Sequence, residues 1–214
     1  MLSRIKGAVF TPDGTILNSV SVHLKAWAKA LEDNGYFVHH ETLQQSFGMA
    51  TPRLLRSMVG EVSDKTLEKI ERDYIKNFRE SLSQIKLFPD SLKALEMLKK
   101  AGIKVGIAAL TDAATAELIL DKNGVLSFVD AIVGSDEVPF GRPDPDIFVE
   151  AFKRIGVNPT MGAVIGSTEY DALSARKINA LSIVISRDSA KKSVKFAELL
   201  FRDLIEAAAE ILSS

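Results

Sequence analysis

Short apolar runs alternate with longer amphipathic segments along most of this chain. The apolar runs lie at 5–10, 103–110, 131–133, 163–165 and 181–185, and each contains β-branched residues. Strands buried on both faces have this composition, and the segments between them repeat their apolar positions at helical spacing. The pattern predicts an α/β fold, a Rossmann-like parallel sheet core with helices on both faces.

One stretch near the N-terminus departs from this alternation. Residues 16–84 show helical periodicity, with the longest helix predicted over 64–82, and we expect no strand there. The chain is therefore predicted to have a core formed by residues 1–15 and 85–214, with residues 16–84 inserted as a helical domain after the first strand. The core is predicted to end in a helix over 199–212.

The loops after the predicted strands carry most of the candidate chemistry. In open parallel sheets, ligands bind at the carboxyl ends of the strands. These ends correspond to loops 11–15, 111–113, 141–143 and 166–171. The topology predicts that the four loops meet at one edge of the sheet.

Composition excludes several classes of function. Among 214 residues, 27 Lys+Arg and 28 Asp+Glu give a net charge of −1, which argues against a broadly basic nucleic-acid binder. The absence of cysteine excludes disulfides, thiolate zinc sites and a cysteine nucleophile. There is neither an apolar run of the ~18 residues that span a bilayer nor a cleavable leader pattern. We expect a cytoplasmic protein with no nucleic-acid or membrane partner, and the cluster of Lys191, Lys192 and Lys195 is predicted to be a solvated face.

Four motifs stand on the four loops in chain order. They read T-P-D-G-T-I-L-N-S from position 11, L-T-D from 110, G-R-P-D-P-D-I-F from 141 and I-G-S-x-x-x-D from 165. Together they resemble the haloacid dehalogenase superfamily, in its phosphoglycolate phosphatase and β-phosphoglucomutase branch, over essentially the whole chain. The resemblance implies a helical cap domain over residues 16–84, a Mg²⁺ cofactor, and phosphoryl transfer through an aspartyl-phosphate.

The resemblance also assigns roles to particular positions. The nucleophile position is Thr11, the general acid/base is Asp13, the residue that bonds the phosphoryl oxygens is Thr111, and the charge-neutralising cation is Arg142. It implies phosphate binding by Asp13, Gly14, Thr111, Asp112 and Arg142, and magnesium binding by Asp13, Ser167 and Asp171.

Three of these positions depart from the family pattern. Thr11 replaces the aspartate nucleophile, Arg142 replaces a lysine, and Ser167 replaces an acidic magnesium ligand. A phosphorylated threonine would be an ordinary ester with a poor alkoxide leaving group, so turnover should stall there. Loss of two carboxylates also weakens a Mg²⁺ site, whereas the planar guanidinium still suits phosphate. We expect a pocket for a small phosphorylated or carboxylated metabolite, with weak or absent turnover.

Three residues of the insertion are candidates for substrate contact. His23 and Trp27 stand four apart on one helix face, as a His and a Trp do in the β-phosphoglucomutases, and Arg53 follows a predicted cap loop. The alternative interpretation of His23 and Trp27 is a half-buried helix stripe. Similarly, Thr111 could serve only as a helix N-cap.

Three functions remain open at this point. The first is a degenerate family member that binds an anionic metabolite and turns it over poorly, a pseudoenzyme candidate. The second is a working Mg²⁺-dependent phosphatase that uses Asp13, and the third is a non-catalytic interaction protein on the same fold. The metal-independent dehalogenases of this superfamily resemble the chain in having a serine near position 167. They also use the first-loop aspartate as the nucleophile, however, and Thr11 replaces it here. A monomer or a homodimer is expected.

Overall fold

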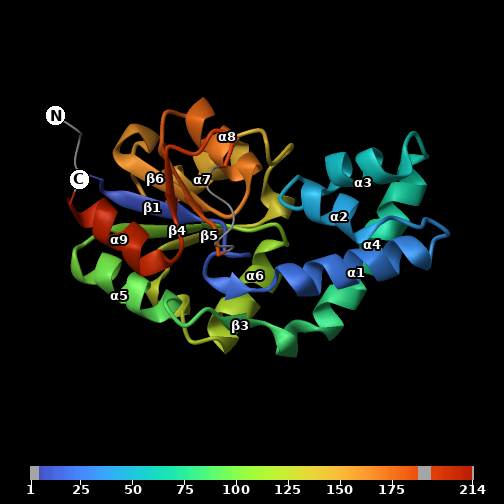
Figure 1. Cartoon of the computed structure of the whole chain (residues 1–214), viewed down its shortest axis with the longest axis horizontal. Coiled ribbons are helices and arrows are strands. Elements are labelled where there is room, and N and C mark those ends of the chain that lie inside the picture. The colour runs from blue at the N-terminus through green and yellow to red at the C-terminus, as the bar shows by residue number, and fades with distance from the viewer. Residues whose placement is uncertain (1–4, 188–193, 214) are drawn as a thin grey trace.

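The computed structural model describes residues 5–187 and 194–213, and within them a six-stranded parallel sheet forms the core (Figure 1). The strand order is β5-β4-β1-β6-β7-β8. The central strand β1 pairs in register with β4 on one side and β6 on the other. The strands are β1 Gly7–Phe10, β4 Lys104–Ala108, β5 Ala131–Val133, β6 Gly162–Gly166, β7 Leu181–Ile185 and β8 Leu199–Phe201. The predicted α/β fold with a parallel sheet is confirmed.

Helices cover both faces of this sheet. Because side chains alternate along a strand, Ala8 and Phe10 point to one face of β1 and Val9 to the other. The first face packs on α5, α6 and α9, and the second on α7 and α8. These helices are α5 Ser91–Lys100, α6 Ala113–Lys122, α7 Asp146–Arg154, α8 Glu169–Lys177 and α9 Leu204–Ser213.

The segment between β1 and α5 forms four helices that lie to one side of the sheet (Figure 1). They are α1 Val20–Glu32, α2 His40–Ser46, α3 Thr51–Val59 and α4 Asp64–Glu80, and are called the cap helices below. Helices α1 and α4 pack along each other, with Ile70 fully buried. The domain limits 16–84 stay a prediction.

Two details of the predicted elements are wrong. The short strands β2 Leu17–Asn18 and β3 Lys86–Leu87 pair antiparallel where the chain leaves and re-enters the core; β2 lies inside the stretch 16–84 expected to be free of strands, and β3 lies just after it. Two residues carry too little periodicity to register as a strand, and their pairing is long-range. Likewise, residues 199–201 form the edge strand β8 rather than the first turn of the last helix, because three apolar residues fit either element.

Short 3₁₀ turns complete the described elements, and they lie at Leu82–Gln84, Leu126–Phe128, Ser135–Glu137 and Pro159–Met161. No described helix is both long enough and apolar enough to cross a membrane. Of the lysine cluster, Lys195 is exposed, while Lys191 and Lys192 lie outside the described residues.

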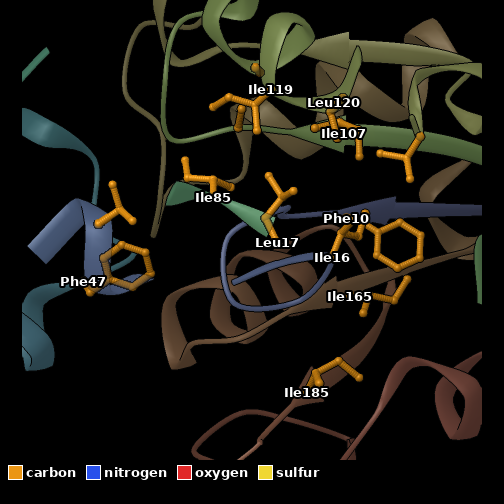
Figure 2. Packing of buried hydrophobic residues seen from close by; sticks show 14 of the residues in the cluster. Phe10, Ile16, Leu17, Phe47, Ile85, Ile107, Ile119, Leu120, Ile165 and Ile185 are labelled. Atoms are coloured by element: carbon orange, nitrogen blue, oxygen red, sulfur yellow. The ribbon is translucent and has the colours of Figure 1, made fainter. Parts of the chain in front are cut away.

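One continuous apolar cluster joins the cap helices to the sheet. Figure 2 shows Leu17 and Ile85 lying between Phe47 on the cap side and Phe10 and Ile107 on the sheet side. All five side chains are buried. The two connecting segments are therefore packed parts of the core, which fixes how the cap stands over the carboxyl edge of the sheet.

Candidate active-site cleft

Thr11 directly follows β1, at the carboxyl edge of the sheet. Its main-chain N–H donates to Ile165 of β6 at 3.0 Å, and its carbonyl accepts from the Thr15 hydroxyl. The side chain is 2 % exposed, and its hydroxyl has no hydrogen-bond partner among the described residues. The nucleophile position of the family thus holds a buried hydroxyl with no base bonded to it.

Asp13 lies in the same loop at the centre of a buried polar chain. Its Oδ1 accepts from the Ser19 hydroxyl at 2.5 Å and from His23 Nε2 at 2.9 Å, and His23 Nδ1 lies 2.7 Å from the Tyr74 hydroxyl. Burial raises the pKa of Asp13, but the His23 charge, the hydrogen bonds from His23 and Ser19, and Arg142 together bring it below the usual value. Asp13 is therefore favoured in its ionised form, and its Oδ1 accepts both hydrogen bonds.

Arg142 and Asp171 form a second buried pair beside the first. Nη1 of Arg142 donates to Asp171 Oδ1, and both side chains are at most 3 % exposed. Asp171 Oδ2 accepts from the N–H groups of Ser167 and Thr168, at 3.1 and 3.0 Å, and from the Thr168 hydroxyl at 2.8 Å. Asp171 and Thr168 thereby form a capping box at the start of α8.

A loop of the cap closes over these two networks. The N–H of Ala50 donates to the Arg142 carbonyl at 2.9 Å, and the Tyr170 hydroxyl donates to the Gln45 carbonyl at 3.2 Å. Gly48 has a φ of +99°, and a Cβ there would stand 2.7 Å from the Thr168 hydroxyl. This close approach requires glycine, and it places the cap loop directly on the core.

Beside this closure lies an open cleft of about 260 Å³ between α4 and the core loops. Thr111, Asp112 and Arg142 line it, whereas Thr11 and Asp13 do not. Among the described residues, no acceptor is found for the main-chain N–H groups of Thr111 and Asp112, for the Thr111 hydroxyl, or for the guanidinium of Arg142 beyond its bond to Asp171. Unpaired N–H donors beside a cation favour an anion.

Arg79 links the cap to the core across the cleft. Its guanidinium donates to the Thr115 hydroxyl from Nε at 3.2 Å and to Asp112 at 3.2 Å. Asp112 is also the N-cap of α6, accepting from the Thr115 N–H at 2.9 Å, so this helix is not capped by Thr111. On the same wall, burial and then the neighbouring Glu68 raise the pKa of Glu71.

The three candidate substrate contacts of the cap are engaged within the protein. His23 bonds Asp13 and Tyr74 and stacks on Phe78 at 4.1 Å between ring centroids. Trp27 stacks on Tyr74 at 3.7 Å. A cavity of about 10 Å³ lies beside His23 and Trp27, which is room for about one water molecule.

Arg53, the third candidate, forms an exposed ion pair with Asp144 at 2.5 Å and is not part of the cleft wall. Gly14 likewise uses its N–H within the first loop, donating to the Leu17 carbonyl at 2.9 Å. Of the predicted phosphate-binding residues, the structure therefore brings Thr111, Asp112 and Arg142 to the cleft, whereas Asp13 and Gly14 are not part of its walls.

The Mg²⁺ that the family implies does not fit the donors in this arrangement. Both oxygens of Asp171 are occupied, one of them by the Arg142 cation, and the Ser167 hydroxyl donates to the Asp13 carbonyl at 2.9 Å. Asp13 is held by Ser19 and His23. The described residues contain no cluster of three or more His, Asp or Glu side chains that could coordinate a metal.

Sequence reasoning missed four residues of the site: Ser19, Tyr74, Arg79 and Thr168. The Ser19 hydroxyl bonds Asp13 and does not cap α1, although Ser19 directly precedes this helix. The sequence does indicate that Tyr74 is buried, since it lies on the apolar face of the predicted helix over 64–82. No sequence pattern indicates the role of Arg79, because its partners Thr115 and Asp112 lie more than thirty positions away in the chain.

A parallel α/β sheet with a helical insertion after its first strand, and with a cleft between the two, defines a class of Rossmann-like proteins that bind ligands at the sheet edge. Within that class, the haloacid dehalogenase-like hydrolase profile matches residues 8–185, and the chain belongs to this family.

The chain is 26% identical over 183 residues to a probable phosphatase, IndB, of Dickeya dadantii, covering 83% of this chain and 80% of that protein. It is 27% identical over 181 residues to the fructose-1-phosphate phosphatase YqaB of Escherichia coli, covering 82% and 94%. A solved hydrolase from Pseudomonas syringae superposes with a TM-score of 0.87 at 25% identity and 97% coverage of both chains. The chain is thus similar to these three proteins over most of its length.

Proposed function

We propose that this protein binds a small phosphorylated or carboxylated metabolite and hydrolyses it weakly or not at all. The observation that carries the proposal is the contrast between the cleft and the first loop. The cleft offers unpaired donors from Thr111, Asp112 and Arg142. The first loop, in contrast, offers the Thr11 hydroxyl, which is buried and has no hydrogen-bond partner among the described residues.

The anion-binding half of the proposal is supported by the donors themselves. Two main-chain N–H groups, one hydroxyl and the remaining N–H groups of a guanidinium together resemble the donor sets that hold phosphate and carboxylate groups. Arg142 supplies a permanent charge because its guanidinium does not lose its proton in proteins. Asp171 neutralises part of that charge and fixes the side chain in place.

Weak turnover is supported by the chemistry of the first loop. A threonine hydroxyl needs a base to become a nucleophile, and none is bonded to Thr11. Asp13, the alternative general base, is already bonded to Ser19 and His23. Metal assistance would also require Asp171 to leave Arg142.

The test combines a binding and a hydrolysis measurement. Isothermal titration calorimetry should detect inorganic phosphate binding to the unmodified protein, and Arg142→Met should abolish it. Hydrolysis of p-nitrophenyl phosphate with Mg²⁺ should stay near background for the unmodified protein and rise for the double variant Thr11→Asp, Ser167→Asp.

Two results would contradict the proposal, and they point to different alternatives. Rapid Mg²⁺-dependent hydrolysis by the unmodified protein, abolished by Asp13→Ala, would establish a working phosphatase. Absence of any phosphate binding would remove the anion site and favour an interaction protein. Arg53→Met is the matched control, because Arg53 is a cap arginine whose ion pair with Asp144 lies outside the cleft wall.

A further inference from the structure

The walls of the cleft are apolar on both sides of the anion donors. Helix α4 contributes Ile75 and Phe78, and the loop before α7 contributes Pro139 and Phe140. Phe140 is 66 % exposed at the mouth of the cleft. A scattered exposed phenylalanine needs no explanation, but this one continues an apolar surface that already lines a pocket.

The backbone holds Phe140 in this place. Asp146, in the first turn of α7, accepts from the N–H of Phe140 at 2.9 Å and from the N–H of Gly141 at 2.9 Å. The loop is therefore fixed at both residues that precede Arg142. The exposed ring and the guanidinium are presented to the cleft by one rigid segment.

Most polar side chains of the walls are already engaged. The Tyr74 hydroxyl bonds His23, Arg79 bonds Asp112 and Thr115, and Asp136 accepts from the Ala113 N–H at 2.9 Å. Apart from Thr111, whose hydroxyl belongs to the anion donors, the free polar side chains of the walls are Thr51, Glu71 and Ser135, as far as the described residues show. A sugar carries several hydroxyl groups, and each one buried here without a partner would lose its hydrogen bonds to water.

We infer that the cleft takes a phosphate monoester whose organic part is a flat apolar group, such as an aromatic ring, rather than a polyhydroxylated sugar. This inference rests on the proposed function, because the phosphate occupies the donors of Thr111, Asp112 and Arg142. The ring lies between the Ile75–Phe78 face of α4 and the Pro139–Phe140 segment. The volume of about 260 Å³ limits the ligand to one or two rings, since it is near the lower end of small-molecule pockets, ~300–1,000 Å³.

The experiment compares four probes by titration calorimetry in buffer containing EDTA, which suppresses metal-dependent hydrolysis. The probes are 1-naphthyl phosphate, glucose 6-phosphate, inorganic phosphate and 1-naphthol. We expect 1-naphthyl phosphate to bind about tenfold or more tightly than glucose 6-phosphate. Phe140→Ser should weaken 1-naphthyl phosphate about fivefold or more and leave inorganic phosphate unchanged.

The matched control is Phe37→Ser. Phe37 is 83 % exposed on the loop between α1 and α2 and does not line the cleft, so its loss should leave all four affinities unchanged. An equal affinity for glucose 6-phosphate, or no effect of Phe140→Ser, would overturn the apolar subsite while the anion site stands. Failure of all three phosphates to bind would overturn the anion site and this inference with it. Equal binding of 1-naphthol and 1-naphthyl phosphate would keep the apolar subsite but overturn the proposed function.

Discussion

At the scale of single residues, two side chains of one loop meet opposite environments. Asp13 is buried with donors from Ser19 and His23, so its charge is stabilised. Thr11, two residues earlier, is equally buried, but its hydroxyl has no partner among the described residues. Since a buried polar group without a hydrogen bond costs free energy, the Thr11 hydroxyl is a point where a small change of sequence or ligand can have a large effect.

Replacing Asp13 tests how much its charge contributes. Asp13→Asn keeps the shape and the acceptor oxygen but removes the charge, and we expect a loss of about 1–3 kcal/mol in the free energy of unfolding at neutral pH. Because the pKa of Asp13 is lowered on folding, the contribution is complete above the ordinary value of 3.8 and fades as the pH falls below it. Urea unfolding of both proteins, from neutral pH down to below this value, measures the difference.

The control for this change is Asp33→Asn. Asp33 pairs with Lys29 at 2.7 Å on the exposed side of α1, so its substitution should leave the urea midpoint unchanged. A difference between the unmodified protein and Asp13→Asn that grows as the pH falls would contradict the assignment of an ionised Asp13.

At the scale of elements, α4 contributes both to the buried core of the cap helices and to one wall of the cleft. Its buried face packs on α1, with Leu67, Ile70 and Tyr74 inside, while Ile75 and Arg79 face the cleft. The helix begins at a real N-cap, since the Ser63 hydroxyl accepts from the Thr66 N–H at 3.2 Å. In contrast, Ser19 precedes α1 without capping it and serves Asp13 instead. A serine therefore caps the helix at the start of α4, whereas the serine before α1 bonds the carboxylate of Asp13 instead.

Removing the N-cap hydroxyl of Ser63 should lower the free energy of unfolding by an amount typical of N-cap residues. We expect Ser63→Ala to lower the free energy of unfolding by about 0.5–2 kcal/mol, and Ser63→Asp to retain most of it, because aspartate caps helices as well as serine does. Thermal and urea unfolding measure both. Ser57→Ala, which removes a hydroxyl bonded to the Leu54 carbonyl within α3, should change stability by less than about 0.5 kcal/mol. An equal loss for both alanine variants would show that the Ser63 cap contributes nothing.

At the scale of the whole molecule, the cap helices and the sheet share one apolar core. The apolar cluster runs from Phe10 and Ile107 through Leu17 and Ile85 to Phe47 without a break (Figure 2). Polar links add to this closure, including Arg79 to Asp112 and Ala50 to Arg142. A continuous core favours a single cooperative unfolding transition.

Trp27 allows this to be measured. It is the only tryptophan of the chain, it is buried in the cap, and it stacks on Tyr74. We expect its fluorescence and the far-UV circular dichroism to report the same urea midpoint. An earlier fluorescence transition would mean that the cap unfolds before the sheet.

The sequence by itself determined the order of the helices and the main strands, the helical insertion, and the four loops that carry the motifs. These follow from local periodicity and from turn residues, which need only neighbours in the chain. The two-residue strands carry too little periodicity to be recognised, and the three apolar residues 199–201 fit a strand as well as a helix.

Only the tertiary structure decided which candidate residues share a surface. It placed Thr111, Asp112 and Arg142 on the cleft, and it left Thr11 and Asp13 off the cleft walls. It also paired Arg142 with Asp171, which lies 29 positions away in the sequence. Burial and hydrogen bonding depend on groups brought together by folding, so no local pattern shows that Arg142 lines the cleft while Asp171 balances its charge.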